Sequence, residues 1–253
     1  MINLALACLY NMLVNEKTRD QLIGLNRTFY QTFAYQFSAT RQRLQPGVVR
    51  ILNQISSQEC VLDLGCGNGE LGKELFSRGH KGPYVGLDSN ADLLKIARKN
   101  LPKVSSVSLI QKDLSSPSWD TDLPIKQYDI ILAFAVLHHI PGAALRKQVI
   151  EKLRSLSVPN GRFIHSEWQF LNSPRLRKRI QPWEKVGLNS DQVEAGDFLI
   201  DWRQGGQGFR YVHLFDVREL ESLAIDTGFT ILETFSSDGE GGNLGLYQIW
   251  KRV

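Results

Sequence analysis

The chain has 253 residues and a mass of 28.7 kDa, with 42% hydrophobic and 22% charged residues, which is ordinary for a soluble globular protein with a sizeable core. A net charge of +4 permits a nucleic-acid partner without requiring one. Three scattered cysteines, Cys8, Cys60 and Cys66, argue against a disulfide framework or a zinc site. No apolar run reaches the roughly 18 residues of a membrane span, so we predict a cytoplasmic protein without a metal or a membrane segment.

The chain begins with a predicted N-terminal helical appendage, residues 1–45. Its apolar start, 1–14, has helical spacing, and we expect a helix that packs on the core or extends from it. A targeting segment is an alternative, although no basic residue precedes the run, and Met12 is a second candidate start. Residues 16–44 also indicate a helix, with aromatic side chains four residues apart: Phe29, Phe33 and Phe37.

After a break at Pro46, short apolar runs alternate with amphipathic stretches through the rest of the domain, 46–253. Strands are expected over 60–64, 84–88, 104–110 and 128–134, from 161, and over 230–235 and 246–251. Helices are expected from 71 and over 91–100, 143–156 and 217–227. Strands joined by helices imply right-handed crossovers and a parallel sheet. The predicted fold is therefore α/β, with a doubly wound, mostly parallel sheet.

An insertion, residues 169–210, interrupts this pattern after the fifth strand. Within 172–185 basic residues outnumber acidic ones five to one, whereas 189–201 holds four acids and no base. Ligands of such sheets bind beyond the carboxyl ends of the strands. We therefore expect the insertion to fold back over that edge as a substrate cover.

The first strand ends in the segment Asp63-Leu64-Gly65-Cys66-Gly67-Asn68-Gly69. Its glycines let the backbone approach a ligand, and the next helix offers its N-terminus. Asp88, at the end of the second strand, can accept hydrogen bonds from both hydroxyls of a ribose. Glu70 would repel the pyrophosphate of a dinucleotide, whereas Asp63 suits an ammonium group. S-adenosylmethionine has that ammonium, a ribose diol and no phosphate; a dinucleotide and a purely structural turn are the alternatives.

In these residues the sequence resembles the class I S-adenosylmethionine-dependent methyltransferases, from about residue 28 onward. The resemblance implies a Rossmann-like fold, S-adenosylmethionine as cofactor, an Asp113 carboxylate that accepts from the adenine amino group, and a covering helix. The implied cofactor residues are Tyr30, Arg41, Asp63, Gly65, Cys66, Gly67, Asp88, Ser89, Asp113, Leu114 and Ala133. A helix N-cap for Asp113, and packing or surface positions for Tyr30 and Arg41, are the alternatives.

His138 and His139 follow the fourth strand, whose exit lies beside the transferred methyl group in this fold. Adjacent side chains diverge and no third ligand has suitable spacing, so no metal site is expected. We expect one histidine to fix the loop and the other to face the substrate, and we assign His139 as the catalytic candidate.

The C-terminal third resembles the tRNA methyltransferases that esterify 5-carboxymethyluridine at the wobble position. The resemblance rests on Gly161-Arg162 with Trp168, on Gly196-Asp197-Phe198 with Trp202, and on Arg210-Tyr211-Val212-His213-Leu214-Phe215. Leu244 stands where that family has Trp, and Asp201 where it has Pro. The resemblance implies a tRNA substrate and a small adaptor subunit as partner.

A carboxylate is already an anion at neutral pH, so its methylation needs no general base. Arg210 is the predicted bidentate holder of that carboxylate, assisted by His213 or His139. Aromatic side chains predicted to stack on the uracil or its neighbours are Trp168, Trp202 and Tyr211. Basic side chains predicted to hold phosphates are Arg175, Arg177, Lys178 and Arg179. The alternatives are core packing for Trp202 and Tyr211, a structural salt bridge for Arg210, and a solvated helix face for the basic segment.

One fold hosts many functions, so a second function stays open: a small-molecule O-, N- or C-methyltransferase of the quinone or secondary-metabolite type. A non-catalytic cofactor-binding partner is a third. The net charge of +4 is low for a tRNA enzyme that acts without an adaptor.

Overall fold

The structure is a computed structural model that describes residues 14–40 and 43–253. Two predictions lie outside this range. One is the helix, or alternatively the targeting segment or second start, expected over the first 13 residues, and the other is the cofactor residue Arg41. Within it, no helix combines the length and the apolar character needed to cross a membrane.

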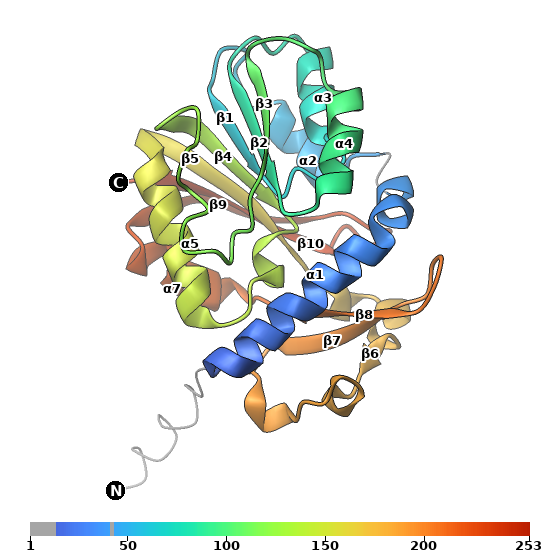
Figure 1. Ribbon diagram of the computed structural model, residues 1–253. Coiled ribbons are helices and arrows are strands. Elements are labelled where there is room, and N and C mark those ends of the chain that lie inside the picture. The colour runs from blue at the N-terminus through green and yellow to red at the C-terminus, as the bar shows by residue number, and fades with distance from the viewer. Residues whose placement is uncertain (1–13, 41–42) are drawn as a thin grey trace, which may run out of the picture.

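A seven-stranded sheet with the order β3-β2-β1-β4-β5-β10-β9 forms the centre of the molecule (Figure 1). Strands β1 to β5 are parallel, and β10 is antiparallel to both of its neighbours. In spatial order the strands are β3 (Val107–Gln111), β2 (Tyr84–Asp88), β1 (Val61–Leu64), β4 (Tyr128–Phe134), β5 (Ser157–Trp168), β10 (Gly245–Arg252) and β9 (Phe229–Ser237). The predicted doubly wound, mostly parallel α/β fold is confirmed. Its strand order reverses between β1 and β4, which is where such sheets bind ligands.

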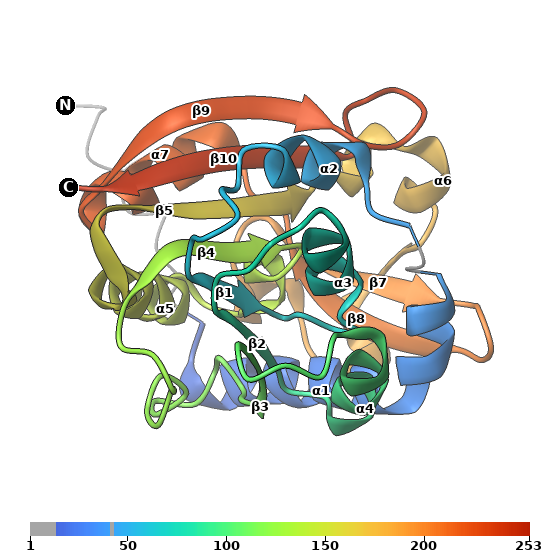
Figure 2. The same cartoon turned by 90° about the horizontal axis from the view of Figure 1, so that it is seen from above.

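Alternate residues of the central strands pack on opposite faces of the sheet. Leu62 and Ile131 lie in one apolar cluster with helices of one layer, and Val61 and Ile130 lie in another with helices of the second layer. The first layer is α5 (Ala143–Leu156) and α7 (Val217–Asp226); the second is α2 (Pro46–Leu52), α3 (Glu70–Ser77) and α4 (Ala91–Asn100). Figure 2 shows helices on both sides of the sheet. Burial on both faces explains why these strands are nearly continuous apolar runs.

Two strands begin three or four residues away from their predicted first residue. The third begins at Val107, because the backbone first makes a turn in which the Val107 amide donates to the carbonyl of Val104 (3.1 Å). The fifth begins already at Ser157, because an irregularity lets the chain pair with β4 on both sides of Asn160, which has a positive φ of 63°.

The insertion forms a second, antiparallel sheet with the order β6-β7-β8. Its elements are α6 (Pro174–Arg177), β6 (Ile180–Gln181), β7 (Asp197–Trp202) and β8 (Gly208–His213), with 3-10 turns at Phe170–Asn172, Trp183–Val186 and Ser190–Gln192. Strand β8 continues past residue 210, the predicted end of the insertion, because its last three residues still pair with the start of β7.

Helix α1 (Glu16–Ala39) crosses the molecule between the two sheets (Figure 1). Leu22 packs on Tyr211 of β8, and Phe29 and Phe33 pack on Trp202 of β7. The helix is thus held by apolar contacts to the insertion. The boundary between an appendage, 1–45, and a domain, 46–253, remains a prediction.

Candidate functional site

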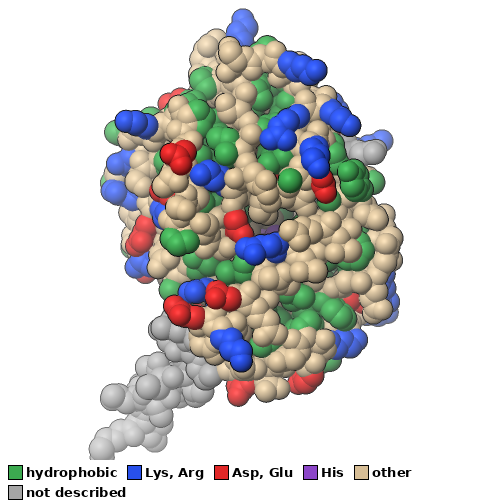
Figure 3. Space-filling model, in the orientation of Figure 1, with side chains coloured by type: hydrophobic (Ala, Val, Ile, Leu, Met, Phe, Trp, Pro, Cys, Tyr) green, Lys and Arg blue, Asp and Glu red, His purple; other side chains and the backbone are tan. Residues whose placement is uncertain are grey.

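A cavity of about 610 Å³ lies at the carboxyl ends of β1, β2 and β4, beneath α1. In the space-filling view the surface is hollowed near the centre of this face, with both basic and acidic side chains around the opening (Figure 3). We call one end the cofactor half, defined by Asp63, Gly67, Asp88 and Asp113. We call the other end the acceptor half, defined by His138, Glu167, Trp168 and Arg210. All eight residues line the cavity.

The glycine-rich loop after β1 binds to the end of β2. The Gly67 amide donates to Oδ2 of Asp88 (2.9 Å), and the Asn90 amide donates to Oδ1 (2.8 Å). Gly65 has a φ of +62°, and a Cβ on it would lie 2.7 Å from Val136, so only glycine fits there. Burial raises the pKa of Asp88, while these two amides oppose the shift. The carboxylate is thereby fixed at the cavity wall.

Asp63 lies at the base of the loop, with only 3% of its surface exposed. The Tyr84 hydroxyl donates to its Oδ2 (2.5 Å). Burial raises the pKa of Asp63 to about 7, against the lowering effect of the Tyr84 hydrogen bond. A carboxyl group in this state gains most from a cationic partner, because the partner compensates for its lost hydration.

Asp113 follows β3 and is held by two neighbours. Arg27 of α1 donates to its Oδ2 (2.9 Å), and the Ser115 hydroxyl donates to its Oδ1 (2.6 Å). Burial alone would raise the pKa of Asp113, but the hydrogen bonds from Ser115 and Arg27 lower it on balance. Arg27 was not among the predicted site residues.

Most of the predicted cofactor residues line one cavity. Those that do are Tyr30, Asp63, Gly65, Cys66, Gly67, Asp88, Ser89, Asp113 and Leu114. Ala133 does not, because β4 turns its side chain into the fully buried cluster under α5. Ala135, two residues further along and with a φ of 57°, lines the cavity instead.

The donor set fits S-adenosylmethionine. Asp63, Asp88 and Asp113 end three neighbouring strands and offer carboxylates for an ammonium group, a ribose diol and an adenine amino group. A Cβ built on Gly67 would meet no atom closer than 3.9 Å, so the backbone there borders open space that a ligand can fill.

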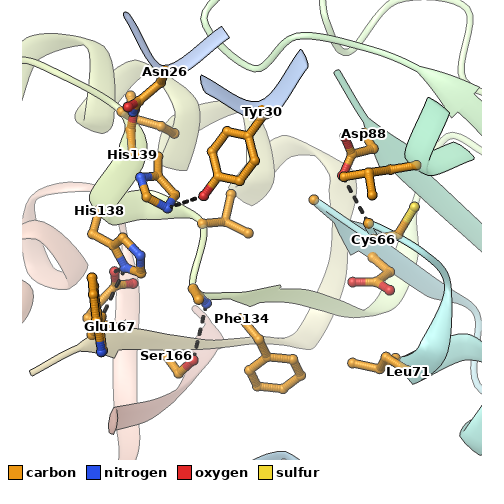
Figure 4. A pocket seen from close by; sticks show the side chains of 18 of the residues that line it. Asn26, Tyr30, Cys66, Leu71, Asp88, Phe134, His138, His139, Ser166 and Glu167 are labelled. Carbon is orange, nitrogen blue, oxygen red and sulfur yellow. Dashed lines mark hydrogen bonds and ion pairs between the residues drawn. The ribbon is translucent and has the colours of Figure 1, made fainter. Parts of the chain in front are cut away.

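His139, the predicted catalytic histidine, is engaged through both ring nitrogens. Its Nδ1 lies 3.1 Å from the Tyr211 carbonyl, and its Nε2 lies 2.7 Å from the Tyr30 hydroxyl (Figure 4). A carbonyl only accepts, so Nδ1 carries the proton, and Tyr30 donates to Nε2. His139 therefore joins α1, the exit of β4 and β8. These contacts match the loop-fixing role predicted for one of the two histidines, and since His139 also lines the cavity, the catalytic role predicted for it stays a prediction.

Arg210, the predicted carboxylate holder, lies in the cavity wall among aromatic rings. Its guanidinium carbon is 4.7 Å from the ring centre of Trp168, 5.5 Å from that of Phe29 and 6.0 Å from that of Trp202. Such a cage orients the planar group by cation–π attraction and keeps its positive charge at the cavity wall. The predicted residue Trp168 also lines the cavity.

Two predicted residues of β8, Tyr211 and His213, point away from the cavity. Successive side chains of a strand alternate, so both lie opposite Arg210. Tyr211 is fully buried, and its hydroxyl donates to Asp197 (2.8 Å). It cannot stack on a base in this conformation, so that prediction was wrong.

His213 was predicted to assist catalysis, and the structure does not place it in the cavity. Its Nδ1 bonds to Asp197 (2.7 Å) and its Nε2 to Glu219 (3.0 Å). Burial would lower the pKa of His213, but these two carboxylates raise it on balance. Arg146 bonds to Glu194 (2.7 Å) and Glu219 (3.3 Å), and the network ties the insertion to α5 and α7.

The remaining predicted substrate residues lie at or beyond the rim. Trp202 is 8% exposed and packs edge-on against Phe29 (5.6 Å between ring centres), outside the cavity lining. In the basic segment only Arg175 lines the cavity; Arg177 and Lys178 are exposed outside it, and Arg179 is half-buried.

A buried acid at the acceptor half was not predicted from the sequence. Glu167 lies between two histidines, with Oε2 at 3.0 Å from His138 Nδ1 and Oε1 at 3.0 Å from His165 Nδ1. Figure 4 shows His138 and Glu167 together at the cavity wall. The alternation of acid and histidine within β5, His165-Ser166-Glu167, was the available signal, since both side chains point to one face of the strand.

Asn26 of α1 was not predicted either. Its amide group donates to the Tyr211 carbonyl (3.1 Å) and accepts from the Tyr211 amide (2.8 Å). Asn26 lies on the buried face of α1 with Leu22, Phe29 and Phe33, and a polar residue at this spacing on an apolar helix face was the available signal.

Comparisons with known proteins identify several similar methyltransferases. A family profile described as a methyltransferase domain matches residues 36–234. Two relatives are named tRNA (carboxymethyluridine(34)-5-O)-methyltransferase. The one from Mus musculus is 28% identical, over 68% of this chain and 25% of that protein. The one from Schizosaccharomyces pombe is 26% identical, over 81% of this chain and 88% of that protein. A malonyl-[acyl-carrier protein] O-methyltransferase of Halalkalibacterium halodurans is 29% identical over 76% of this chain and 73% of that protein. A solved structure of a SAM-dependent methyltransferase from Methanosarcina mazei has a TM-score of 0.62 at 22% identity, covering 83% of this chain and 98% of that one, which shows a shared fold.

Proposed function

We propose, since the chain belongs to the S-adenosylmethionine-dependent methyltransferases, that it methylates the carboxylate of a 5-carboxymethyluridine at the wobble position of tRNA. The observation that carries the proposal is Arg210. Its guanidinium lines the cavity and is caged by aromatic rings at 4.7 to 6.0 Å. A cation so placed favours an anionic acceptor, because a neutral phenol or carbon nucleophile offers it no counter-charge.

The cofactor, when bound, supplies a methyl group on a positively charged sulfur. The residues of the acceptor half then orient and shield the nucleophile rather than deprotonate it. Arg210 would hold the carboxylate through two parallel hydrogen bonds, and Trp168 would stack on the guanidinium and limit the access of water. A nucleophile that is already ionised needs no general base, and His139 is consistent with this, because both of its nitrogens serve to join α1 and β8.

Relatives with two different named activities support an acidic acceptor. Carboxymethyluridine and a malonyl group both carry a carboxyl group, and the relatives named for them are 26 to 29% identical to this chain. The tRNA assignment also draws on Arg175 at the cavity rim, with Arg177 and Lys178 exposed beside it. A small adaptor subunit could add further basic surface.

A small-molecule O-methyltransferase is the second candidate function. The observation that favours it is the relative from Halalkalibacterium halodurans, which matches 76% of this chain. The modest net charge of +4 points the same way.

The test is methyl transfer from labelled S-adenosylmethionine to a panel of acceptors. The panel holds a tRNA with 5-carboxymethyluridine, the same tRNA with uridine, a malonyl-loaded carrier protein, and a phenol. We expect label only in the carboxymethylated tRNA. Label in the malonyl-loaded carrier protein alone would contradict the tRNA substrate and favour the second candidate function. Label in the phenol alone would contradict a carboxylate acceptor.

A further inference from the structure

The chain of polar side chains His138, Glu167 and His165 has no role in the chemistry described so far. Glu167 is 1% exposed, His138 2% and His165 fully buried. Glu167 and His138 line the cavity, next to Trp168, whose ring stacks on the Arg210 guanidinium. A buried carboxyl group in contact with two imidazoles could act as a proton acceptor or as a neutral acid, and the hydrogen-bond directions distinguish the two.

The decisive contact lies at Nδ1 of His138. The backbone amide of Trp168 donates to this atom (3.4 Å), so Nδ1 presents a lone pair and carries no proton. The same atom lies 3.0 Å from Oε2 of Glu167. A hydrogen bond between them then needs a proton on the carboxyl oxygen, which means that Glu167 donates.

The second imidazole fits this arrangement. Burial lowers the pKa of His165 to about 3, so its ring is neutral and can carry one proton. Its Nδ1 lies 3.0 Å from Oε1 of Glu167, which accepts from it. The other nitrogen, Nε2, is then unprotonated; it is buried without a hydrogen-bond partner among the described residues, a position that suits a lone pair better than an N–H.

The charged groups around Glu167 do not require an anion there. Burial raises the pKa of Glu167 well above its usual range, a backbone hydrogen bond from His138 opposes that shift, and the carboxylate of Glu219, from α7, adds to it. Arg146 of α5 opposes it, but its guanidinium is bonded to Glu194 (2.7 Å) and Glu219 (3.3 Å). On the neighbouring strand β10, the residue paired with Glu167 is the non-ionisable Leu246.

We propose that Glu167 is a positioning residue that stays a neutral acid, donates to Nδ1 of His138 and so fixes His138 in the tautomer with its proton on Nε2. The cavity wall at Glu167 and His138 then carries no negative charge that would repel a carboxylate. This consequence for the acceptor rests on the proposed function, because an acceptor that had to lose a proton would need the opposite tautomer, with Nε2 free to accept.

The informative substitution is Glu167→Gln. A glutamine amide donates through its NH2 and accepts through its oxygen, which is the pattern of the neutral acid and not of the carboxylate. We expect Glu167→Gln to retain turnover near pH 7, and we expect the parent but not this variant to lose turnover at alkaline pH, where Glu167 ionises. Glu167→Leu, which removes both hydrogen bonds, is the matched apolar variant and should lose about tenfold or more in kcat.

The tautomer can be read without any acceptor. In ¹⁵N-labelled protein, long-range ¹H–¹⁵N correlation spectra should show His138 protonated on Nε2 in both the parent and Glu167→Gln. A His138 protonated on Nδ1 in the parent, or a Glu167→Gln variant that folds and binds S-adenosylhomocysteine but has lost turnover, would overturn the inference. Because the spectra use no acceptor, a failure to methylate carboxymethylated tRNA would count against the proposed function alone.

Discussion

The cofactor half of the cavity is assembled from consecutive strand ends, whereas the acceptor half is assembled from segments far apart in the chain. Asp63, Gly67 and Asp88 lie within 26 residues, and the Gly67–Asp88 hydrogen bond spans 21 positions. In the acceptor half, Arg210 of β8 lies against Trp168 of β5 and Phe29 of α1, and His138, after β4, bonds to Glu167 of β5. The first half is a property of the parallel sheet; the second depends on how α1 and the insertion dock on it.

This difference predicts a separation of binding from turnover. Changes in the cofactor half should weaken the binding of S-adenosylhomocysteine, and changes that remove a charge or a hydrogen bond from the acceptor half should slow methyl transfer while leaving that binding intact. Substitutions in each half test the separation, beginning with the largest expected effect.

Arg210→Ala should produce the largest loss, in turnover only. Removing a donor that holds the reacting anion costs about 2–4 kcal/mol of transition-state stabilisation, or roughly 30- to 900-fold in kcat/KM. Arg210→Lys should also be impaired, because it keeps the charge but loses the planar fork. The measurement is steady-state methyl transfer to the accepted substrate, with calorimetry of S-adenosylhomocysteine binding on the same preparations.

Arg203→Ala is the matched control for Arg210. Arg203 follows β7, pairs with Asp201 (2.6 Å) and has 63% of its side chain exposed, outside the cavity lining. It should turn over like the parent. Equal losses of turnover in Arg203→Ala and Arg210→Ala would mean that the insertion tolerates neither change. That result would contradict the predicted separation of cofactor binding from turnover.

Asp88→Ala should give the next largest effect, in cofactor binding. The Asp88 carboxylate is fixed by the amides of Gly67 and Asn90. Losing its hydrogen bonds to the ribose should cost roughly 1.5–3 kcal/mol, or about 10- to 160-fold in the Kd of S-adenosylhomocysteine. Unchanged binding would show that the ribose lies elsewhere.

The sequence predicted the cofactor half well because its information is local. A glycine-rich turn and two acids at strand ends specify their own neighbours once the strands are parallel, and the apolar runs required a parallel sheet. Ala133 was misplaced because it lies within β4 with its side chain in the buried cluster, whereas Ala135, one residue beyond the end of that strand, reaches the cavity through a backbone turn with a positive φ of 57°. The acceptor half could be predicted only in part. Arg210 lines the cavity as expected, but His213 and Tyr211 do not, because the sequence did not show that β8 is an extended strand with alternating faces. Glu167 was missed because its partner His138 comes from another element.

The third prediction concerns pH and sharpens the description of the cofactor half. Burial raises the pKa of Asp63 to about 7, so at lower pH the free protein carries a neutral Asp63. Binding of the ammonium group must then expel a proton. The affinity for S-adenosylhomocysteine should fall by about tenfold for each pH unit below 7 and level off above it.

Asp63→Asn is the control for that profile. It should bind more weakly at pH 8 and lose the slope between pH 6 and 7. Asp88 is also buried with a raised pKa, so a slope that survives in Asp63→Asn would assign the titration to Asp88 instead.

The smallest effect is expected at the rim of the acceptor half, where the basic segment meets solvent. Arg175, Arg177 and Lys178 are exposed, and an exposed cation contributes to RNA binding mainly by releasing counterions. Replacing all three by Gln should lower tRNA affinity only a few-fold at moderate salt, but it should flatten the plot of log Kd against log salt by about 0.7 for each single-stranded phosphate that is no longer neutralised. Arg98, Lys99 and Lys103, three exposed basic residues in and just after α4, provide a matched charge-removal control whose slope should stay close to that of the parent. Filter binding over a salt series measures both slopes. If the slopes agree, the segment is a solvated helix face, and the acceptor half recognises its substrate through the cavity around Arg210 alone.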